Sequence, residues 1–345
     1  MEPTKLSAAL DTIASNTGFS GAVHVRQGKR DLYQKAFGYA DRSNQIPNSL
    51  DTRFGIASGT KFFTALAIGR LIEAGKLDFS SKVAELIPWD FQHYSRKITL
   101  RQLLTHTSGI PDYYDEEKVD DFDNFTVGVP WYELKGPRDY LAVFPDEAMK
   151  FPPGERFSYS NSGYILLGVL IEEISGIPYR EFVEKEIFAP AGMDRSGYFA
   201  MNKLPEGTAF GYVQEESGWR TNIYNLPIIG ASDGGAYTTI HDIASLWDAF
   251  WDHRILSKEM VETYTTPYME TTSESADKFY GHGIWIRTGT DLGTEEYIVG
   301  EDAGVSFYSG VTRAKKLLVT VVSNTTEGAW PILRAIREIL DSQAI

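Results

Sequence analysis

Apolar residues recur along this chain with two different periods, and each period predicts a different kind of element. Near the start, an apolar residue at every third or fourth position predicts a helix over residues 5–14. Two short apolar runs then predict strands at 22–25 and 32–37, joined by a turn at 27–29. The chain is therefore expected to open with a helix and a hairpin.

The middle of the chain is dominated by helical patterns. Helices are predicted at about 58–74, at 98–107, from Asn161 to Gly176, after Pro178, and at 240–251. The first of these is expected to stop at Gly75, because glycine commonly terminates helices. Residues 112–150 are instead acidic, aromatic and irregular, and long loops of this kind often border a site.

The last part of the chain returns to strand patterns. Strands are predicted at 284–287, 297–299, 305–309 and 317–323, and a helical stripe follows at 330–340. Strands at both ends favour an α/β (α+β) fold in which the two ends of the chain build one sheet, flanked by the terminal helices. We expect a single domain over 1–345, with a sheet region at about 1–55 and 280–345 and a mainly helical region at about 56–279.

Composition narrows the classes of function. The 345 residues include 47 acidic and 33 basic ones, a net charge of −14, and an acidic surface repels the phosphates of nucleic acids. The chain has no cysteine, which excludes disulfides, thiolate metal sites and a cysteine nucleophile. The six histidines show no metal-ligand spacing and no phosphate-binding loop is present, so we expect neither a metal nor a cofactor.

Hydrophobic length argues against a membrane span. The longest apolar run, about 164–171, is much shorter than the ~20 residues that a spanning helix needs. The first residues carry no basic segment followed by an apolar stretch, so no signal peptide is seen and a cytoplasmic location is expected.

The pattern Ser-x-x-Lys occurs twice, at Ser58–Lys61 and at Ser275–Lys278. The second copy lies in a polar, acidic segment and is interpreted as a solvated loop. The first copy opens a predicted helix, where residues three apart share one face and the helix N-terminus favours an oxyanion. Two interpretations remain open: a nucleophile with a nearby base, or a serine N-cap followed by a surface lysine.

A third residue would make the Ser58–Lys61 pair chemically stronger. Lysine and tyrosine titrate near 10, so either needs a shift of about three pKa units, or roughly 4 kcal/mol, to act as a base near pH 7. Tyr159 is the one tyrosine of nineteen that is followed two residues later by asparagine, Asn161. Tyr159 would exchange a proton with Ser58, and Asn161 would donate to a substrate carbonyl and contact Lys61. Alternatively, the segment only caps a helix.

A rival nucleophile pattern is present at 230–234. Gly-Ala-Ser-Asp-Gly matches the G-x-S-x-G elbow of α/β-hydrolases, and Asp277 and His282 follow Ser232 in the right order. That elbow requires a helix directly after it, whereas here several residues separate it from the helix predicted at Ile240. The context therefore disfavours Ser232 as the nucleophile.

Four segments together resemble the serine β-lactamase and penicillin-binding-protein superfamily, in particular its class C β-lactamase-like branch of esterases and D-amino-acid peptidases. They are FGIASGTKFFTALAI, ITLRQLLTHTSGI, FPPGERFSYSNSGYILLGVLIEEISG and ASDGGAYTTIHDIASL, in the order that the family has them. The resemblance covers nearly the whole chain. It implies a β-lactamase-like fold with an antiparallel sheet built from both chain ends and an inserted helical region.

The resemblance also implies roles for individual residues. Ser58 would be the acylated nucleophile, Lys61 and Tyr159 the pair that transfers protons, and Asn161 a substrate-orienting residue. The segment around Ser232 would be a buried structural turn, and His106 would pack within its helix. No metal or cofactor is implied.

The third motif departs from the family pattern. The family usually places Lys-Thr-Gly or His-x-Gly on a strand beside the nucleophile, and the matching stretch here was aligned at 300–305. In that alignment Glu301 falls where a cation or a neutral ring would lie, and the alternative is that Glu301 only faces water. The backbone N–H near Gly304 would pair with that of Ser58 as an oxyanion hole.

These observations predict a serine hydrolase that acts on a small ester, amide or peptide. An acidic residue in the pocket weakens the case for substrates that carry a carboxylate, so a carboxylesterase or a D-amino-acid peptidase is favoured, and an acidic pocket would suit a substrate amine. The alternatives are a β-lactamase or DD-peptidase-like penicillin-binding protein, and a non-catalytic binding protein of the same fold.

Overall fold

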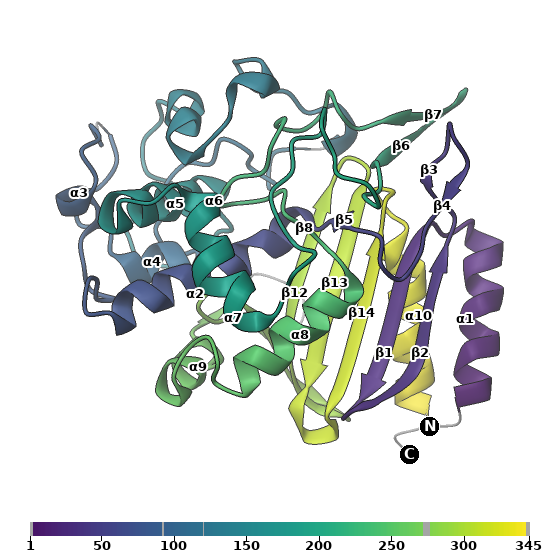
Figure 1. Cartoon of the computed structure of the whole chain (residues 1–345). Helices are drawn as coiled ribbons and strands as arrows, with labels where there is room; N and C mark the ends of the chain where they lie inside the picture. The colour runs from purple at the N-terminus through teal and green to yellow at the C-terminus, as the bar shows by residue number, and fades with distance from the viewer. Residues whose placement is uncertain (1–2, 92, 120, 272–276, 343–345) are drawn as a thin grey trace.

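The computed structural model describes residues 3–91, 93–119, 121–271 and 277–342. Its centre is an eight-stranded antiparallel sheet in the order β2-β1-β14-β13-β12-β11-β10-β9 (Figure 1). The strands are β1 (Gly21–Gln27), β2 (Arg30–Phe37), β9 (Met269–Glu270), β10 (Lys278–Tyr280), β11 (Trp285–Thr290), β12 (Gly293–Asp302), β13 (Val305–Thr312) and β14 (Leu317–Ser323). Because β1 pairs with β14, both ends of the chain build one sheet, which confirms the fold class predicted from the strand pattern.

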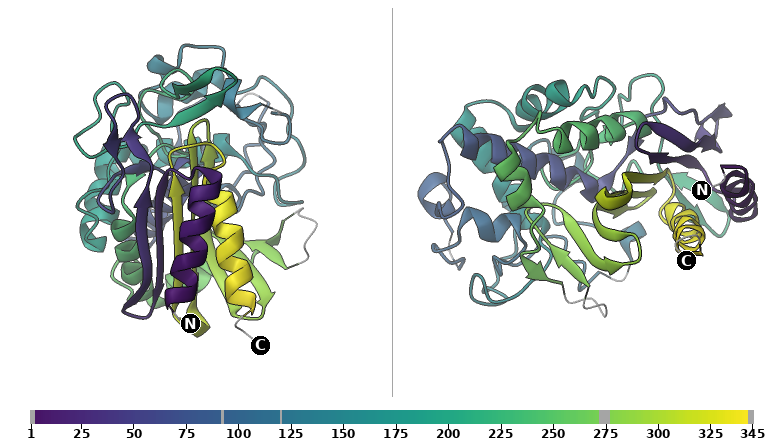
Figure 2. Two further views of the ribbon diagram at one scale, coloured as in Figure 1. Left: turned by 90° about the vertical axis from the view of Figure 1, so that its right-hand side faces the viewer. Right: turned by 90° about the horizontal axis from the view of Figure 1, so that it is seen from below.

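One face of the sheet is covered by the two terminal helices, α1 (Pro3–Thr17) and α10 (Ala329–Ser342) (Figure 2). Their apolar stripes pack on the side chains that alternate residues of each strand direct to this face. The cluster includes Leu6, Leu10, Val23, Val25, Val321, Ile332 and Ile336. This burial is the stabilising term that holds the two ends of the chain together.

The opposite face is covered by the helical region. Its helices are α2 (Thr60–Glu73), α3 (Val83–Leu86), α4 (Leu100–Leu104), α5 (Asn161–Ser175), α6 (Tyr179–Val183), α7 (Ala189–Ala191), α8 (Ile240–Trp251) and α9 (Lys258–Tyr264). Helices α2 and α5 are apolar almost all round, which is typical of buried helices. Helix α8 packs on the sheet, where the Trp247 indole donates to Ser309 of β13 at 2.9 Å. None of the described helices combines the length and apolar character needed to cross a membrane.

The ends of the helices follow local chemistry. Ser160 caps α5 by accepting a hydrogen bond from the Gly163 N–H at 3.0 Å, and α5 ends at Gly176 with a φ of 71°. Helix α4 is shorter than the predicted 98–107. Its chain leaves the helix because His106 has a φ of 55°, a left-handed conformation that a right-handed helix cannot contain.

Several short strand pairs were not predicted. They are β3 (Tyr39–Asp41) with β4 (Ile46–Pro47), β5 (Phe54–Gly55) with β8 (Tyr237–Thr238), and β6 (Tyr212–Glu215) with β7 (Gly218–Thr221). Strands of two to four residues are too short to show a period of two. The β5–β8 pair matters for the site, because it joins the residues just before Ser58 to those just after the turn at 230–235.

The predicted irregular segment at 112–150 contains only three short turns of 3-10 helix in its described part. These turns are η2 (Phe122–Asn124), η3 (Trp131–Glu133) and η4 (Pro137–Val143). The segment is fastened to α5, because the buried Asp112 carboxylate accepts from the backbone N–H groups of Asn161 at 2.7 Å and Ser162 at 2.8 Å. An ion pair between Asp115 and Lys150 at 2.9 Å closes its far end.

Candidate active site

Ser58 lies in a turn of 3-10 helix, η1 (Ala57–Gly59), that leads directly into α2. The preceding residue, Ala57, has a φ of 45°, which is uncommon for alanine and marks a locally constrained backbone. Strand β12 packs against this turn at Gly300, where a Cβ atom would lie only 2.8 Å from the backbone nitrogens of Ser58 and Gly59. Only glycine therefore allows the strand to approach the serine this closely.

Lys61 is the centre of the hydrogen-bond network around Ser58. Its buried ammonium group donates to Ser58 Oγ at 2.9 Å, to Asn161 Oδ1 at 2.6 Å and to the carbonyl oxygen of Asp233 at 2.7 Å. Burial lowers the pKa of Lys61, and the neighbouring carboxylates oppose that effect. The three acceptors hold the lysine amine beside the serine hydroxyl, which is the arrangement that a proton acceptor needs.

Tyr159 completes the group that the sequence suggested. Its side chain hydrogen-bonds Ser58, and Lys61 Nζ lies 4.8 Å from the centre of its ring. Burial raises the pKa of Tyr159 well above its ordinary value, and the hydrogen bond from Ser58 opposes that shift. The phenol is therefore protonated near pH 7, so it is suited to donate a proton.

His106 supports the ring of Tyr159 and stays neutral. Its Nδ1 accepts from the backbone N–H of Ser160 at 3.0 Å, and its ring centre lies 4.3 Å from that of Tyr159. Burial, with the Lys61 charge next, lowers the pKa of His106 well below its usual value. Its packing role agrees with the expectation.

Asn161 contacts Lys61 as expected, but its amide group is already engaged. The side-chain nitrogen donates to the Tyr114 carbonyl at 2.9 Å and to the Asp112 carboxylate at 3.2 Å. Asn161 also lines the pocket. The geometry shows it holding the lysine in place, whereas the expected donation to a substrate carbonyl would require its amide to leave these partners.

The rival nucleophile Ser232 is buried in a structural turn. Its hydroxyl packs tightly against Gly168 of α5 and has no hydrogen-bond partner among the described residues. Its carbonyl accepts from Thr64 of α2. In the second Ser-x-x-Lys copy, Ser275 lies outside the described residues, and Lys278 begins the edge strand β10. Ser232 therefore does not present its hydroxyl to the pocket.

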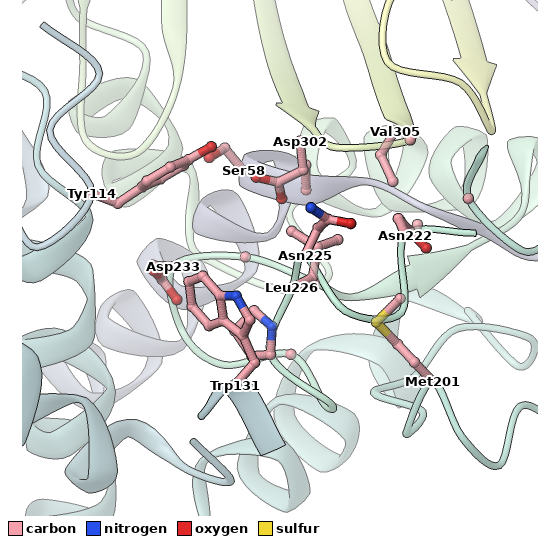
Figure 3. Close-up of a pocket in the computed structure, with 18 of the residues that line it drawn as sticks. Ser58, Tyr114, Trp131, Met201, Asn222, Asn225, Leu226, Asp233, Asp302 and Val305 are labelled. Carbon is pink, nitrogen blue, oxygen red and sulfur yellow. The ribbon is translucent and has the colours of Figure 1, made fainter. Parts of the chain in front are cut away.

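A cavity opens beside Ser58. Its described lining includes seven aromatic and four asparagine side chains, and no lysine, arginine or histidine. Figure 3 shows Asp302 on the same side as Ser58, with Asp233 and Trp131 across the cavity. Among the described lining residues, the two aspartates are the only ones with an ionisable acidic or basic group other than tyrosine, so the cavity wall is acidic.

Comparison with known proteins identifies the fold. The family described as Beta-lactamase matches residues 8–344. The chain belongs to the beta-lactamase family. A penicillin-binding protein from Bacillus halodurans has a similar crystal structure, with 42% identity, a TM-score of 0.89, and coverage of 96% of this chain and 99% of that one. Penicillin-binding protein 4* of Bacillus subtilis is 29% identical over 98% of this chain and 76% of its own length.

The structural neighbours also include a D-amino acid amidase from Ochrobactrum anthropi. It has 22% identity, a TM-score of 0.79, and coverage of 98% of this chain and 99% of that one, so this likeness shows a shared fold. The family indicates a hydrolase of the serine type, and with the penicillin-binding relatives it bears out the resemblance stated from the four sequence segments.

The stretch expected to carry the third motif lies partly on β12, but Glu301 does not face the cavity as expected. Side chains alternate across a strand, so Ile298, Gly300 and Asp302 share the face toward Ser58, and Glu301 faces the other way. Glu301 does not line the cavity, and its carboxylate accepts from the Trp330 indole of α10 at 2.8 Å. The neighbours of Gly300 on this face are therefore the buried, apolar Ile298 and the acidic Asp302.

Gly304 also differs from the expectation. It lines the cavity, but its N–H donates to Thr326 Oγ1 at 2.9 Å and is not free to bind an oxyanion. The backbone beside Ser58 on β12 is instead that of Gly300. The sequence offered one signal for this correction. Side chains two residues apart on a strand share a face, so Asp302 lies on the face of Gly300 toward Ser58, and Glu301 lies on the opposite face.

Acids missed by the sequence reasoning surround the lysine. Burial is the largest cause in each case, and it raises the pKa of Asp112 to about 6, raises that of Asp302 to about 8, and raises that of Asp233. Lys61 opposes all three shifts. One cation therefore serves several carboxyl groups that are partly held in their neutral form.

This excess of buried acid predicts a fall in stability at alkaline pH. A carboxyl whose folded pKa is about 8 keeps a proton that the unfolded chain has lost above about pH 4, so stability decreases as pH rises toward 8. The pH range of this prediction begins at pH 6.5. Below that pH, His24, His106 and His282, whose pKa values are lowered, make stability increase with pH instead. Urea unfolding should give a lower free energy at pH 8 than at pH 6.5.

The variant Asp302→Asn isolates one part of this effect. It should reduce the fall in unfolding free energy between pH 6.5 and 8 by on the order of 1 kcal/mol, the linkage expected for one carboxyl over this interval. If the unfolding free energy of the variant and of the parent protein falls equally between pH 6.5 and 8, Asp302 is already ionised in the folded chain at pH 6.5.

Proposed function

We propose that this protein is a serine hydrolase that cleaves ester or amide bonds of small substrates through an acyl-enzyme on Ser58. The observation that carries the proposal is the buried lysine amine 2.9 Å from Ser58 Oγ, held there by Asn161 and the carbonyl of Asp233. A lysine that only capped a surface would not be buried with three acceptors. The serine, by contrast, remains accessible from the cavity.

The proposed reaction begins with the substrate carbonyl beside the N-terminal turn of α2. The partial positive charge of the helix dipole at that turn stabilises the oxyanion. Ser58 Oγ bonds to the carbonyl carbon, and its proton passes to the neutral amine of Lys61. Tyr159 donates its proton to the leaving group as the bond breaks, and Lys61 returns a proton to the phenolate.

Deacylation follows the same path in reverse. Water attacks the acyl carbon, its proton is taken by the Lys61–Tyr159 pair, and Ser58 regains a proton as the acid leaves. In this scheme Lys61 is the initial base and Tyr159 the acid. The opposite directions of their pKa shifts support that division, because the amine is shifted toward its neutral form and the phenol is kept protonated.

The cavity favours an esterase or a D-amino-acid peptidase over a β-lactamase. Substrates with a carboxylate would meet Asp302 and Asp233 in a wall without a cationic side chain. The described lining offers that carboxylate no counter-charge, and desolvating an unpaired anion is costly. The penicillin-binding relatives nevertheless keep a second candidate open, a β-lactamase or DD-peptidase, which must bind such a carboxylate.

Covalent trapping tests the proposal. The protein would be incubated separately with a fluorophosphonate, a nitrophenyl ester and a fluorescent penicillin, then digested with trypsin and analysed by mass spectrometry. We expect the fluorophosphonate and ester adducts on peptide 54–61, in which Ser58 is the one serine, and little penicillin adduct. A stable penicillin adduct would favour the second candidate, and no adduct with any reagent would favour a non-catalytic binding protein.

A further inference from the structure

Asp302 is an acidic side chain of the cavity that no other described group of the protein engages. It ends β12 and points to the face shared with Gly300, which contacts the turn of Ser58. Its carboxylate makes no hydrogen bond or ion pair with the rest of the described chain. A carboxyl group in a partly closed wall pays a desolvation cost that a partner would offset.

Three other polar side chains of the wall are already used by the protein. Asp233 accepts from the hydroxyl of Tyr113, Asn222 donates to the Ala303 carbonyl at 2.8 Å, and Asn225 donates to the Asp123 carbonyl at 2.5 Å. These groups shape the cavity, whereas Asp302 is left available to a ligand.

The charges around Asp302 favour a cation as that ligand. The nearest cation, Lys61, is committed to Ser58, Asn161 and the Asp233 carbonyl. The groups that act on Asp302 are Lys61 from α2, Asp233 from the turn before β8, Glu116 from the loop after α4, and its neighbour Glu301. Lys61 is itself acted on by four carboxyl groups, those of Asp233, Glu116, Asp112 and Asp302. An added positive charge would therefore be attracted and an added negative charge repelled.

Aromatic rings complete a surface that suits an ammonium ion. Tyr114, Phe125 and Trp131 line the same cavity, and Figure 3 shows Tyr114 and Trp131 flanking the space below Ser58 and Asp302. Ring faces attract cations, most strongly when water is excluded, and an ammonium group supplies the donors that the carboxylate lacks. An uncharged acyl chain would gain only the aromatic contact.

We propose that Asp302 binds a free ammonium group on the acyl part of the substrate, so that the Ser58 hydrolase prefers aminoacyl esters and amides. This inference rests on the proposed function, because it names the substrate class of the same site. The pKa of Asp302, raised to about 8 by burial, agrees with it: a bound cation would favour the ionised carboxylate and release a proton.

The test compares substrates that differ only in the amine. Phenylalanine p-nitroanilide, as each enantiomer, would be compared with its N-acetyl derivative and with 3-phenylpropionyl p-nitroanilide, which lacks the amine. We expect kcat/KM for the better enantiomer to exceed that of both neutral analogues at least tenfold, since hydrogen bonds to charged groups contribute this much. In Asp302→Asn, the ratio of amine to desamino substrate should fall at least tenfold.

Glu301→Gln provides the matched control. It removes the same charge one residue earlier, on a side chain that faces Trp330 instead of the cavity. The substrate ratio should stay within about twofold of the parent. If Asp302→Asn fails to fold, as judged by circular dichroism, Asp302→Ser replaces it with the same expected loss.

Each outcome separates this inference from the proposed function. Equal kcat/KM for the amine and desamino substrates, or an unchanged ratio of these two values in Asp302→Asn, overturns the ammonium site. If Ser58 is still acylated by a neutral ester, the proposed hydrolase function stands. Absence of any Ser58 adduct or turnover overturns both. If Glu301→Gln lowers the ratio of kcat/KM for the amine and desamino substrates as much as Asp302→Asn does, the preference comes from the overall negative charge of the region, and a specific site at Asp302 is rejected.

Discussion

Replacing Ser58 with alanine should lower kcat for a nitrophenyl ester by about 10⁴-fold or more, with no adduct on peptide 54–61. The loss is large because the bond to the acyl group forms at Ser58 Oγ, and neither Lys61 nor Tyr159 has a second hydroxyl nearby to replace it in the network. The fold should persist, since the substitution removes one atom at the edge of a cavity. Steady-state kinetics and intact-protein mass spectrometry check both statements.

Ser232→Ala is the control for this experiment. Ser232 belongs to the G-x-S-x-G pattern, but its hydroxyl is buried against Gly168 and unpaired among the described residues. The variant should keep kcat within about threefold of the parent. Loss of activity in Ser232→Ala together with full activity in Ser58→Ala would reverse the assignment of the nucleophile.

The second large effect is expected for Lys61→Met, which keeps the length of the side chain and removes its charge. Turnover should fall by about 10²–10⁴-fold, the range for loss of a positioned general base. The free energy of unfolding should also fall by about 1–3 kcal/mol, because the Asn161 and Asp233 oxygens lose a buried donor. Kinetics and urea titrations of the same preparation measure the two effects.

Lys150→Met separates the two consequences. Lys150 is largely buried and pairs with Asp115 at 2.9 Å, but it has no contact with Ser58. This variant should lose a similar amount of stability while retaining most of its turnover. If Lys61→Met keeps more than a tenth of the parent activity, proton transfer does not pass through Lys61.

The sequence predicted those parts of the fold that have a long, regular pattern. The stripe over 240–251 and the run at 317–323 coincide with α8 and β14, because each buries one face or both against the core. The helix predicted at 98–107 was too long, since nothing in its pattern revealed the left-handed backbone of His106. Strands of two residues, such as β5, left no pattern to detect.

The candidate site was predicted in part. Ser58, Lys61, Tyr159 and Asn161 could be found because short motifs fix their types and spacing, and the structure brings them together. The acidic residues could not be found in this way, because Asp112 and Asp302 act on Lys61 only through their burial beside it. That burial depends on three segments that lie far apart in the chain. Glu301 was chosen over its neighbour because the face of β12 toward the serine is set by packing at Gly300.

The strand that walls the cavity lies more than two hundred residues beyond the serine it borders. During synthesis, Ser58, Lys61 and Tyr159 leave the ribosome well before β12 and its partner β13 (Figure 1). Closing such a loop is slow compared with local helix formation. A nascent chain would thus carry its reactive serine without the surrounding wall, and the onset of hydrolysis would report the moment when the late strands dock.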